Sequence, residues 1–296
     1  MAPQRVEFAP AKVNLCLHVT GRRGDGYHLL DSLVVFADVG DTVRLSPANQ
    51  FTLRISGPMA AGLETDDSNL VLRAARALHK ARGSTIRGFE LELEKNLPVA
   101  SGIGGGSADA AATLRGVQAL IDPDRPNPED MAEIALILGA DVPACLGTDP
   151  VRMRGIGEQI SEIPPLPECH IVLVNPGVEV ATGTVFSKLG GRFSAGLEQF
   201  PTQPFTSAAD LCAWLKRQRN DLEAPAIASA PQIGHVLDAL AGTQENLLAR
   251  MSGSGATCIG LYASARHANA AADSITKSDN DWWSVATQVL PISGTS

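Results

Sequence analysis

The sequence lacks the features that mark several large classes of protein. It has no run of basic residues and a formal net charge of −8, which argues against nucleic-acid binding. No apolar stretch is long enough to span a membrane, and the first residues do not resemble a secretion signal. The five cysteines contain no CxxC pair, which argues against a disulfide framework or a cysteine zinc site. These absences predict a cytoplasmic protein that binds neither nucleic acid nor membrane.

Two familiar phosphate-binding motifs are also missing from the most glycine-rich stretch, LPVASGIGGGSADAAA at residues 97–112. A Walker A loop requires Lys and then Ser or Thr after its last glycine, whereas Gly106 is followed by Ser107 and Ala108. The dinucleotide pattern GxGxxG, counted from Gly102, has Ser107 in place of its third glycine. The stretch is therefore neither of these loops.

The residues on either side of the glycines nevertheless predict an anion site. Alternating apolar and acidic residues over 89–94 are typical of a half-buried strand, and an Ala-rich run with Leu114, Val117 and Leu120 predicts a buried helix. Glycines can turn backbone N–H groups toward a ligand, and a helix N-terminus adds unpaired N–H groups and partial positive charge. Strand, loop and helix together favour a phosphate site. The alternative is a flexible glycine turn between two core elements.

The whole chain, at 296 residues, is long enough for two domains with a core each. The proline-rich segment SEIPPLPEC predicts a boundary near residue 160, which gives domains 1–160 and 161–296. The first domain should be rich in antiparallel strands, with a break at Pro10 and a turn from Asp38 to Asp41. Its predicted strands cover 5–20, 30–36, 42–45, 51–55, 89–94 and 151–160, and its helices cover 70–81, capped within Asp66–Ser68, and 128–138.

The second domain should form a small αβ layer. Its predicted strands cover 170–175, 258–262 and 285–290, and its helices cover 207–219, 233–240 and 265–276. The segment PGVEVATGTVFSKL is predicted to be a loop that carries Thr182, Thr184 and Phe186. Residues 190–203 are predicted to form a second, long loop, which is either a lid or a surface excursion.

Several polar residues are candidates for a functional site, although each also has an ordinary structural explanation. Lys12 shares a strand face with Asn14 just after a proline, although a solvated lysine is the simpler alternative. Tyr27 and His28 follow a glycine-rich loop, where they could also be a satisfied pair at the start of a strand. Asp141 follows a helix C-terminus, which is electrostatically unfavourable for a carboxylate and so favours a functional role over a simple turn.

A second loop of glycine and serine, MSGSGAT at residues 251–257, precedes a predicted strand. On its own, such a segment is more typical of a hairpin turn than of a site. It gains weight because it is the second loop in this chain that could wrap phosphates.

Three of these segments resemble the motifs of one family, the GHMP small-molecule kinases. PVASGIGGGSADAA resembles their phosphate loop, and AKVNLCL and MSGSGAT look like their other two motifs, in the same order. PAKVNLCLHVTGRRGDGYHLLDSL, LGADVP, GIGE and NDLEAPA are similar to the members that phosphorylate a CDP-linked methylerythritol. The resemblance spans nearly the whole chain. It implies an α/β (α+β) fold with a ribosomal-protein-like, β-rich nucleotide-binding N-terminal domain and a ferredoxin-like C-terminal domain.

The resemblance also implies an activity and a set of site residues. The chain would move the γ-phosphate of ATP, with Mg²⁺, to the 2-hydroxyl of a CDP-linked methylerythritol in non-mevalonate isoprenoid synthesis, as a monomer or weak homodimer. Lys12 and Asp141 would be catalytic. ATP would bind Pro98, Val99, Ala100, Ser101, Gly102, Ile103, Gly104, Gly105, Gly106, Ser107 and Asp109. The acceptor would bind Asn14, Tyr27, His28, Thr182 and Phe186, with Tyr27 and Phe186 sandwiching the cytosine.

Two positions depart from the family pattern, and other functions remain open. Ile103 replaces a usual Leu, and Ala108 replaces a frequent second Ser, which leaves Ser107 as the one hydroxyl there. Another kinase of the family, such as a homoserine or mevalonate kinase, is the first alternative, and Tyr27, His28 and LGADVP argue against it. A catalytically idle binding module is the second, and the presence of both Lys12 and Asp141 argues against that. A structural protein without a ligand is the third.

Overall fold

The computed structural model describes residues 4–123 and 128–292, which divide into two compact units. Unit 1 takes in the described residues of Met1–Ala11, Val39–Val99 and Gly104–Gly147. Unit 2 takes in those of Lys12–Asp38, Ala100–Ile103 and Thr148–Ser296. The units are therefore not consecutive halves of the chain, because the chain passes between them several times.

Unit 1 is a sheet covered by helices. Two long strands, β1 (Arg5–Arg22) and β2 (His28–Ala48), contribute part of their length to it, together with β3 (Thr52–Ser56) and β4 (Gly88–Glu94). The strand order is β3-β4-β2, with β3 parallel and β2 antiparallel to β4. The predicted alternation in β4 is confirmed, since its apolar side chains are buried and its glutamates are half-buried. That apolar face is where the helices of the unit pack.

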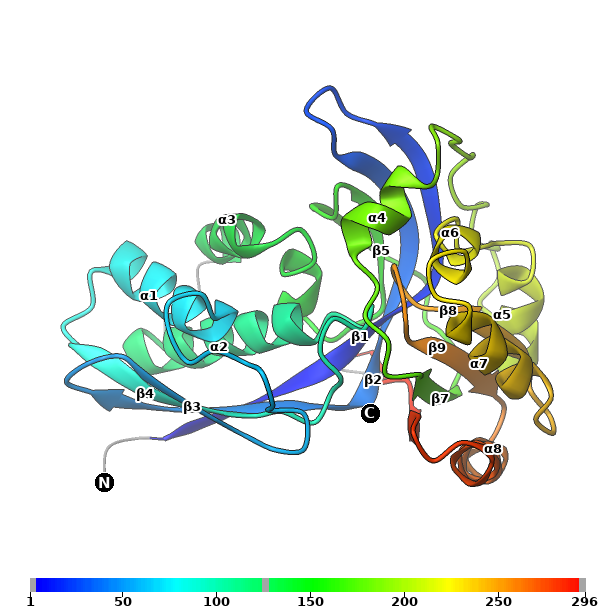
Figure 1. Cartoon of the computed structure of the whole chain (residues 1–296). Coiled ribbons are helices and arrows are strands. Elements are labelled where there is room, and N and C mark those ends of the chain that lie inside the picture. Colours follow the sequence, from blue (N-terminus) through cyan, green and yellow to red (C-terminus); the bar gives the residue numbers. More distant parts are fainter. Residues whose placement is uncertain (1–3, 124–127, 293–296) are drawn as a thin grey trace. The chain divides into compact units, whose positions relative to one another are not determined.

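The helices of unit 1 are α1 (Leu70–Arg82), α2 (Gly105–Ile121) and α3 (Pro128–Leu138), followed by the short 3₁₀ helix η1 (Pro143–Leu146). Figure 1 shows these helices gathered over one face of the β3–β4 sheet. The Ala-rich sequence of α2 leaves small side chains along most of its length, so α1 and η1 can pack close to it.

Unit 2 contains two sets of strands. A hairpin of β5 (Val151–Gly155) and β6 (Gln159–Glu162) pairs with the first part of β2, Leu30 opposite Gly155. A separate antiparallel sheet has the order β10-β7-β9-β8. Its strands are β7 (His170–Asn175), β8 (Leu248–Met251), β9 (Cys258–Tyr262) and β10 (Trp283–Gln288).

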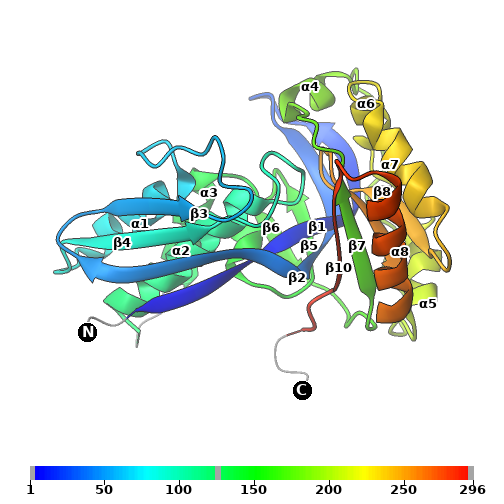
Figure 2. The ribbon, with the colours of Figure 1, turned by 60° about the horizontal axis from the view of Figure 1, so that its bottom comes forward.

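The helices of unit 2 are α4 (Thr182–Ser187), α5 (Ala208–Leu215), α6 (Glu223–Ile227), α7 (Gln232–Ala241) and α8 (Ala265–Ser278). Figure 2 shows α7 and α8 along one face of the β10-β7-β9-β8 sheet. Val172 and Val174 of β7 and Cys258 of β9 lie in the core that these helices complete. The antiparallel sheet with helices across it agrees with the αβ layer predicted for this part of the chain.

Two predicted interruptions of the long strands are wrong, and both have a physical reason. β1 runs through Pro10 without a break. Among the described strands β1 pairs with β2 alone, and such an edge position tolerates a residue without an N–H group. β2 likewise runs through the predicted turn at Asp38–Asp41. A Cβ on Gly40 would lie 2.3 Å from the Ala9 carbonyl oxygen, so this glycine permits close strand contact rather than a turn.

Several smaller predictions also need correction. The cap of α1 is Asn69, whose side chain accepts a hydrogen bond from the Val71 N–H at 2.9 Å, rather than a residue of Asp66–Ser68. The segment with Thr182 and Phe186 is the short helix α4, not a loop. Helix α5 ends at Leu215 and strand β10 lies at Trp283–Gln288, which is earlier than predicted for both.

The long loop predicted at residues 190–203 has no helix or strand beyond a turn at its start, but it is anchored. Asp31 accepts the Leu197 N–H at 2.9 Å and a paired contact from Arg152 at 2.8 and 2.6 Å. The Ser194 N–H donates to the Val19 carbonyl of β1 at 2.9 Å. These bonds favour a surface excursion over a lid. Across the described ranges, no helix combines the length and the apolarity that crossing a membrane requires.

Candidate functional site

The predicted phosphate loop, Pro98–Ser107, begins in unusual backbone conformations and ends in a regular helix. Ala100, Gly102 and Gly104 have φ values of +51°, +75° and +64°, in the left-handed region that favours glycine. Gly104 is the N-cap of α2, and it has no side chain with which to accept hydrogen bonds from the first-turn N–H groups of Gly105, Gly106 and Ser107. Those donors, together with the helix dipole, suit a phosphate.

The middle of the loop is held in unit 2 by the MSGSGAT segment. The Ser252 hydroxyl donates to the Gly102 carbonyl at 3.0 Å, and the Thr257 N–H donates to the Ser101 carbonyl at 3.0 Å. A Cβ on Gly102 would lie 2.6 Å from the Ser252 carbonyl oxygen and 2.7 Å from that of Gly255. Two of the family-like motifs therefore meet backbone to backbone, and only a glycine fits between them.

The third family-like motif, on β1, also contacts these two segments. The Lys12 N–H donates to the Ile103 carbonyl at 2.9 Å, and the Asn14 N–H donates to the Ser252 hydroxyl at 3.0 Å. The side chains of both residues are buried, and the Lys12 ammonium donates to Asn14 Oδ1 at 3.2 Å. Asn14 in turn donates to the Ser32 hydroxyl at 2.7 Å. Lys12 is thus an ordered, buried cation rather than a solvated lysine.

Two of the predicted acceptor residues stack on one another. The rings of His28 and Phe186 have centroids 4.7 Å apart at 26°, and Phe193 meets His28 edge-on at 6.3 Å. Partial burial, with a contribution from the charge of Arg22, lowers the pKa of His28 below its ordinary value, so its imidazole is neutral at pH 7. The Tyr27 side chain is 57% exposed and lies against the Arg23 guanidinium.

Thr182 lies at the start of α4 and contacts the MSGSGAT segment, where its hydroxyl is 2.9 Å from that of Ser254. The segment is fixed from beneath by Asn220, whose buried amide donates to the carbonyls of Met251 and Gly253 at 2.8 Å each. Asn220 belongs to the NDLEAPA motif, and no role was predicted for it from the sequence. Its signal was the helix-starting pattern NDLE, which points to a local cap as readily as to a long-range contact.

Asp141 lies in unit 1, two residues after the Gly139 N–H closes helix α3 on the Ala135 carbonyl at 3.1 Å. Its side chain is half-buried, and the following turn is closed by the Val142 N–H on the Gly139 carbonyl at 3.1 Å. The predicted end of this helix at Leu138 is confirmed. The carboxylate is therefore carried on a short, well-defined turn between α3 and η1.

Asp109 is buried within α2 and takes part in an ion cluster that was not predicted from the sequence. Its Oδ2 accepts a hydrogen bond from Lys95 at 2.8 Å, and Lys95 also contacts Asp41. Lys95 directly follows an alternating strand, where a lysine ordinarily marks the solvated end. Asp41 was attributed to a turn. No local pattern connects residues that are 54 and 14 positions from Lys95.

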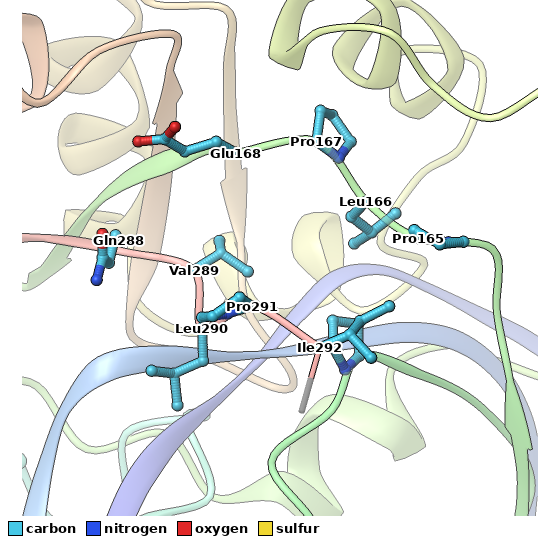
Figure 3. A pocket seen from close by; sticks show the side chains of 10 residues that line it. Pro165, Leu166, Pro167, Glu168, Gln288, Val289, Leu290, Pro291 and Ile292 are labelled. Atoms are coloured by element: carbon cyan, nitrogen blue, oxygen red, sulfur yellow. The ribbon is translucent and has the colours of Figure 1, made fainter. Parts of the chain in front are cut away.

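The structure also has a hollow of about 450 Å³ in unit 2 that contains none of the predicted site residues. Prolines and aliphatic side chains of the segment Pro165–Glu168 and of residues after β10 line it (Figure 3). It holds one acidic side chain and no basic one, which does not suit a phosphate.

Comparison with known proteins identifies the family. The model of the GHMP kinases N terminal domain matches residues 69–148, and that of the GHMP kinases C terminal matches residues 197–281. The chain belongs to the GHMP kinase family. It is therefore an ATP-dependent small-molecule kinase, as predicted.

Close relatives of this GHMP kinase share one name. A 4-diphosphocytidyl-2-C-methyl-D-erythritol kinase of Cereibacter sphaeroides is 54% identical over 93% of this chain and 96% of its own. One of Ruegeria pomeroyi is 52% identical over 96% and 98%. A crystal structure of 4-(cytidine 5'-diphospho)-2C-methyl-D-erythritol kinase superposes with a TM-score of 0.76 at 32% identity, covering 96% of this chain and 99% of that one. The two-domain GHMP kinase fold predicted from the sequence is confirmed.

Proposed function

We propose that this chain transfers the γ-phosphate of ATP to the 2-hydroxyl of 4-diphosphocytidyl-2-C-methyl-D-erythritol, giving the 2-phosphate and ADP in non-mevalonate isoprenoid precursor synthesis. Relatives at 52–54% identity carry the name of that kinase. The structural observation that carries the acceptor assignment is the stack of His28 on Phe186. A half-buried aromatic face with a neutral imidazole suits a cytosine, which offers a flat ring and a polar edge. Tyr27, Asn14 and Thr182 complete the proposed acceptor set.

In this proposal, ATP lies along Pro98–Ser107 with its phosphates toward the start of α2. Supporting this placement are the left-handed conformations at Gly102 and Gly104 and the first-turn N–H groups that Gly104 cannot cap. Phosphoryl transfer requires positioning and charge stabilisation more than covalent chemistry from the protein. Preorganised backbone donors provide both.

Asp141 and Lys12 are the proposed catalytic residues. Asp141 would orient the acceptor hydroxyl and take its proton, and Lys12 would stabilise negative charge in the transition state. The burial of the Lys12 ammonium supports this role, because a buried cation acts in a low dielectric and is held in one position.

Mg²⁺ would be bound mainly by the phosphates of ATP, where it neutralises charge on the β- and γ-oxygens. The Ser107 hydroxyl, in the first turn of α2, is the ligand that this chain offers beside those phosphates. Within the described residues no cluster of three or more His, Cys, Asp or Glu could hold a metal ion. We also propose a cytoplasmic monomer or weak homodimer with a domain boundary near residue 160.

A different acceptor is the main alternative. A homoserine kinase from Cytophaga hutchinsonii has a TM-score of 0.67 at 19% identity, and the mevalonate kinase of Methanococcus jannaschii has 0.69 at 11%. Likeness at that identity concerns the fold alone. ADP release from ATP and Mg²⁺ should be measured with CDP-methylerythritol, homoserine or mevalonate offered separately. Release with the CDP-linked polyol alone is expected, and release with another acceptor would overturn the acceptor assignment. No release with any acceptor would favour an idle binding module.

Asp141→Asn tests the proton acceptor. We expect ATP binding to be near normal and turnover to fall by about 10²–10⁴-fold, because the amide cannot take the proton. The matched control is Asp122→Asn, since Asp122 also follows a helix of unit 1 and has no proposed role. Turnover in Asp141→Asn equal to that of the control would rule out the proton-acceptor role.

A further inference from the structure

Three buried charged side chains of unit 1 lie beside the phosphate loop. The Lys95 ammonium donates to Oδ2 of Asp41 and, at 2.8 Å, to Oδ2 of Asp109. The three side chains are 3%, 0% and 4% exposed, so water contributes almost nothing to their solvation. They come from three different elements, because Asp41 lies in β2, Lys95 directly after β4 and Asp109 in α2.

Asp41 also holds the start of the loop. Its second oxygen, Oδ1, accepts the N–H groups of Asn96 and Leu97 at 2.6 and 2.9 Å. The Asn96 amide donates to the Gly40 carbonyl at 3.2 Å. The residues that lead into the loop are thus bonded to one short stretch of β2, and Asp41 uses both carboxylate oxygens.

The same ammonium lies directly beneath the end of the loop. A Cβ on Gly105, the first residue of α2, would be 3.0 Å from Lys95 Nζ and 3.7 Å from Asp41 Oδ2. Asp109, one turn further along α2, is the partner of that ammonium. Lys95 therefore connects the side chain that holds the start of the loop to the helix on which the loop ends.

Stability alone is a poor explanation for this arrangement. Removing charges from water is costly, and well-packed apolar residues often stabilise a fold as well as a buried ion pair does. Here two carboxylates share one ammonium, and no donor among the described residues reaches Asp109 Oδ1. Burial and the nearby Asp41 raise the pKa of Asp109 to about 7, despite the opposing charge of Lys95. What the charges provide is a directional link between three backbone segments.

We propose that Asp41, Lys95 and Asp109 form a loop clamp that fixes both ends of the phosphate loop, with Asp41 and Lys95 as positioning residues for ATP. Asp41 and Lys95 act by holding the loop in position, and neither side chain touches the nucleotide. The inference rests on the proposed ATP-binding role of Pro98–Ser107. It does not depend on which acceptor the kinase uses.

The test measures binding of ATP with Mg²⁺ to the full chain in the absence of any acceptor. Lys95→Met leaves two facing carboxylates without their cation. Asp41→Asn keeps the shape but offers one acceptor oxygen where two are used, so either Lys95 or the N–H groups of Asn96 and Leu97 lose their partner. We expect each variant to raise the Kd for ATP by about tenfold or more, because a misplaced loop loses hydrogen bonds to phosphate. With acceptor, KM for ATP should rise more than kcat falls.

Two control variants separate positioning from general destabilisation. Leu78→Ala opens a cavity in the buried face of α1 and lowers stability without touching the clamp. Arg44→Met breaks an exposed ion pair with Glu94, 2.9 Å long, between the same two strands β2 and β4. Both controls should bind ATP as the wild type does, at a temperature where all the variants are folded.

The proposal is overturned if Asp41→Asn binds ATP like the wild type, or if Leu78→Ala binds it as weakly as Asp41→Asn. If Lys95→Met fails to fold, the ATP binding of Asp41→Asn alone tests the proposal, because that substitution hardly changes the side-chain volume. A wild-type chain that binds ATP but phosphorylates none of the three acceptors would overturn the proposed function and leave the clamp in place.

Discussion

In unit 1 the residues that flank the proposed phosphate loop are held by charged side chains, whereas in unit 2 the middle of that loop is held by backbone atoms and a single hydroxyl. The flanks depend on Asp41, Lys95 and Asp109. The middle depends on Ser252 and on Gly102, which lies in backbone contact with Gly255. The first support should respond to changes of charge and pH, and the second to added volume or a lost hydroxyl. The two can therefore be broken separately.

The largest effect is expected from Gly102→Ala. The new Cβ would lie 2.6–2.9 Å from backbone atoms of Ser252 and Gly255, at a φ of +75° that side chains rarely adopt. The free energy of unfolding, measured in urea, should fall by about 3 kcal/mol. Gly106→Ala is the control, since its Cβ would meet only Leu70 at an ordinary 3.6 Å and alanine favours a helix. Equal stability of the two variants would contradict the backbone contact.

An intermediate effect is expected from Ser252→Ala. The change leaves the Gly102 carbonyl and the buried Asn14 N–H without their shared hydroxyl, at a cost of about 1–3 kcal/mol in unfolding free energy. Ser254→Ala in the same segment removes a hydroxyl whose partner, Thr182, is exposed, and should cost less than about 0.5 kcal/mol. If the two serines proved equivalent, Ser252 would not be the link between the motifs.

The most gradual effect is a pH dependence of at most about 1.4 kcal/mol in unfolding free energy per pH unit, and it separates the charged support from the neutral one. The folded pKa of Asp109 is about 7 against an ordinary value of 3.8, so between those values the folded chain binds a proton that the unfolded chain releases. Stability from this group is therefore fully present at low pH and is lost as the pH rises toward 7. Asp109→Asn should flatten the dependence of unfolding free energy on pH over that window. The change corresponds to a difference of up to about one bound proton between the folded and unfolded chains. Ser252→Ala should leave the slope unchanged, and equal slopes for Asp109→Asn and the wild type would contradict the assignment.

Local patterns in the sequence predicted the elements around the site well. The strand–loop–helix arrangement over β4 and α2, the end of α3 before Asp141 and the strand β7 all follow from periodicity and from glycine placement. The resemblance of the glycine-rich segment and of two further segments to GHMP kinase motifs also pointed to the right family, although no Walker motif is present. These features are decided by residues that are close together in the chain.

The supports of the loop could not be predicted, because the same residue types serve local and distant contacts. Gly40 and Asp41 have the composition of a turn, yet one permits strand contact and the other binds Lys95 and two N–H groups. Ser252 lies in the hairpin loop between β8 and β9, as its sequence suggests, yet its hydroxyl bonds to Asn14 and Gly102. Whether such a residue makes a local or a distant contact is decided only when the fold brings distant segments together.

The assignment of Lys12–Asp38 to unit 2 has a consequence for how the chain is made. Unit 1 can be completed once Gly147 has been synthesised, whereas the Leu290 N–H that donates to the Phe36 carbonyl at 2.7 Å, and the bridge from Val289 to Ala37, come near the end. During translation β1 can pair with β2 at once, whereas the β2 residues Leu30–Val34, Phe36 and Ala37 must wait for partners more than a hundred residues downstream, while the ribosome adds about 5–20 residues per second. Strand β2 is therefore fully paired only after segments that are made long after it.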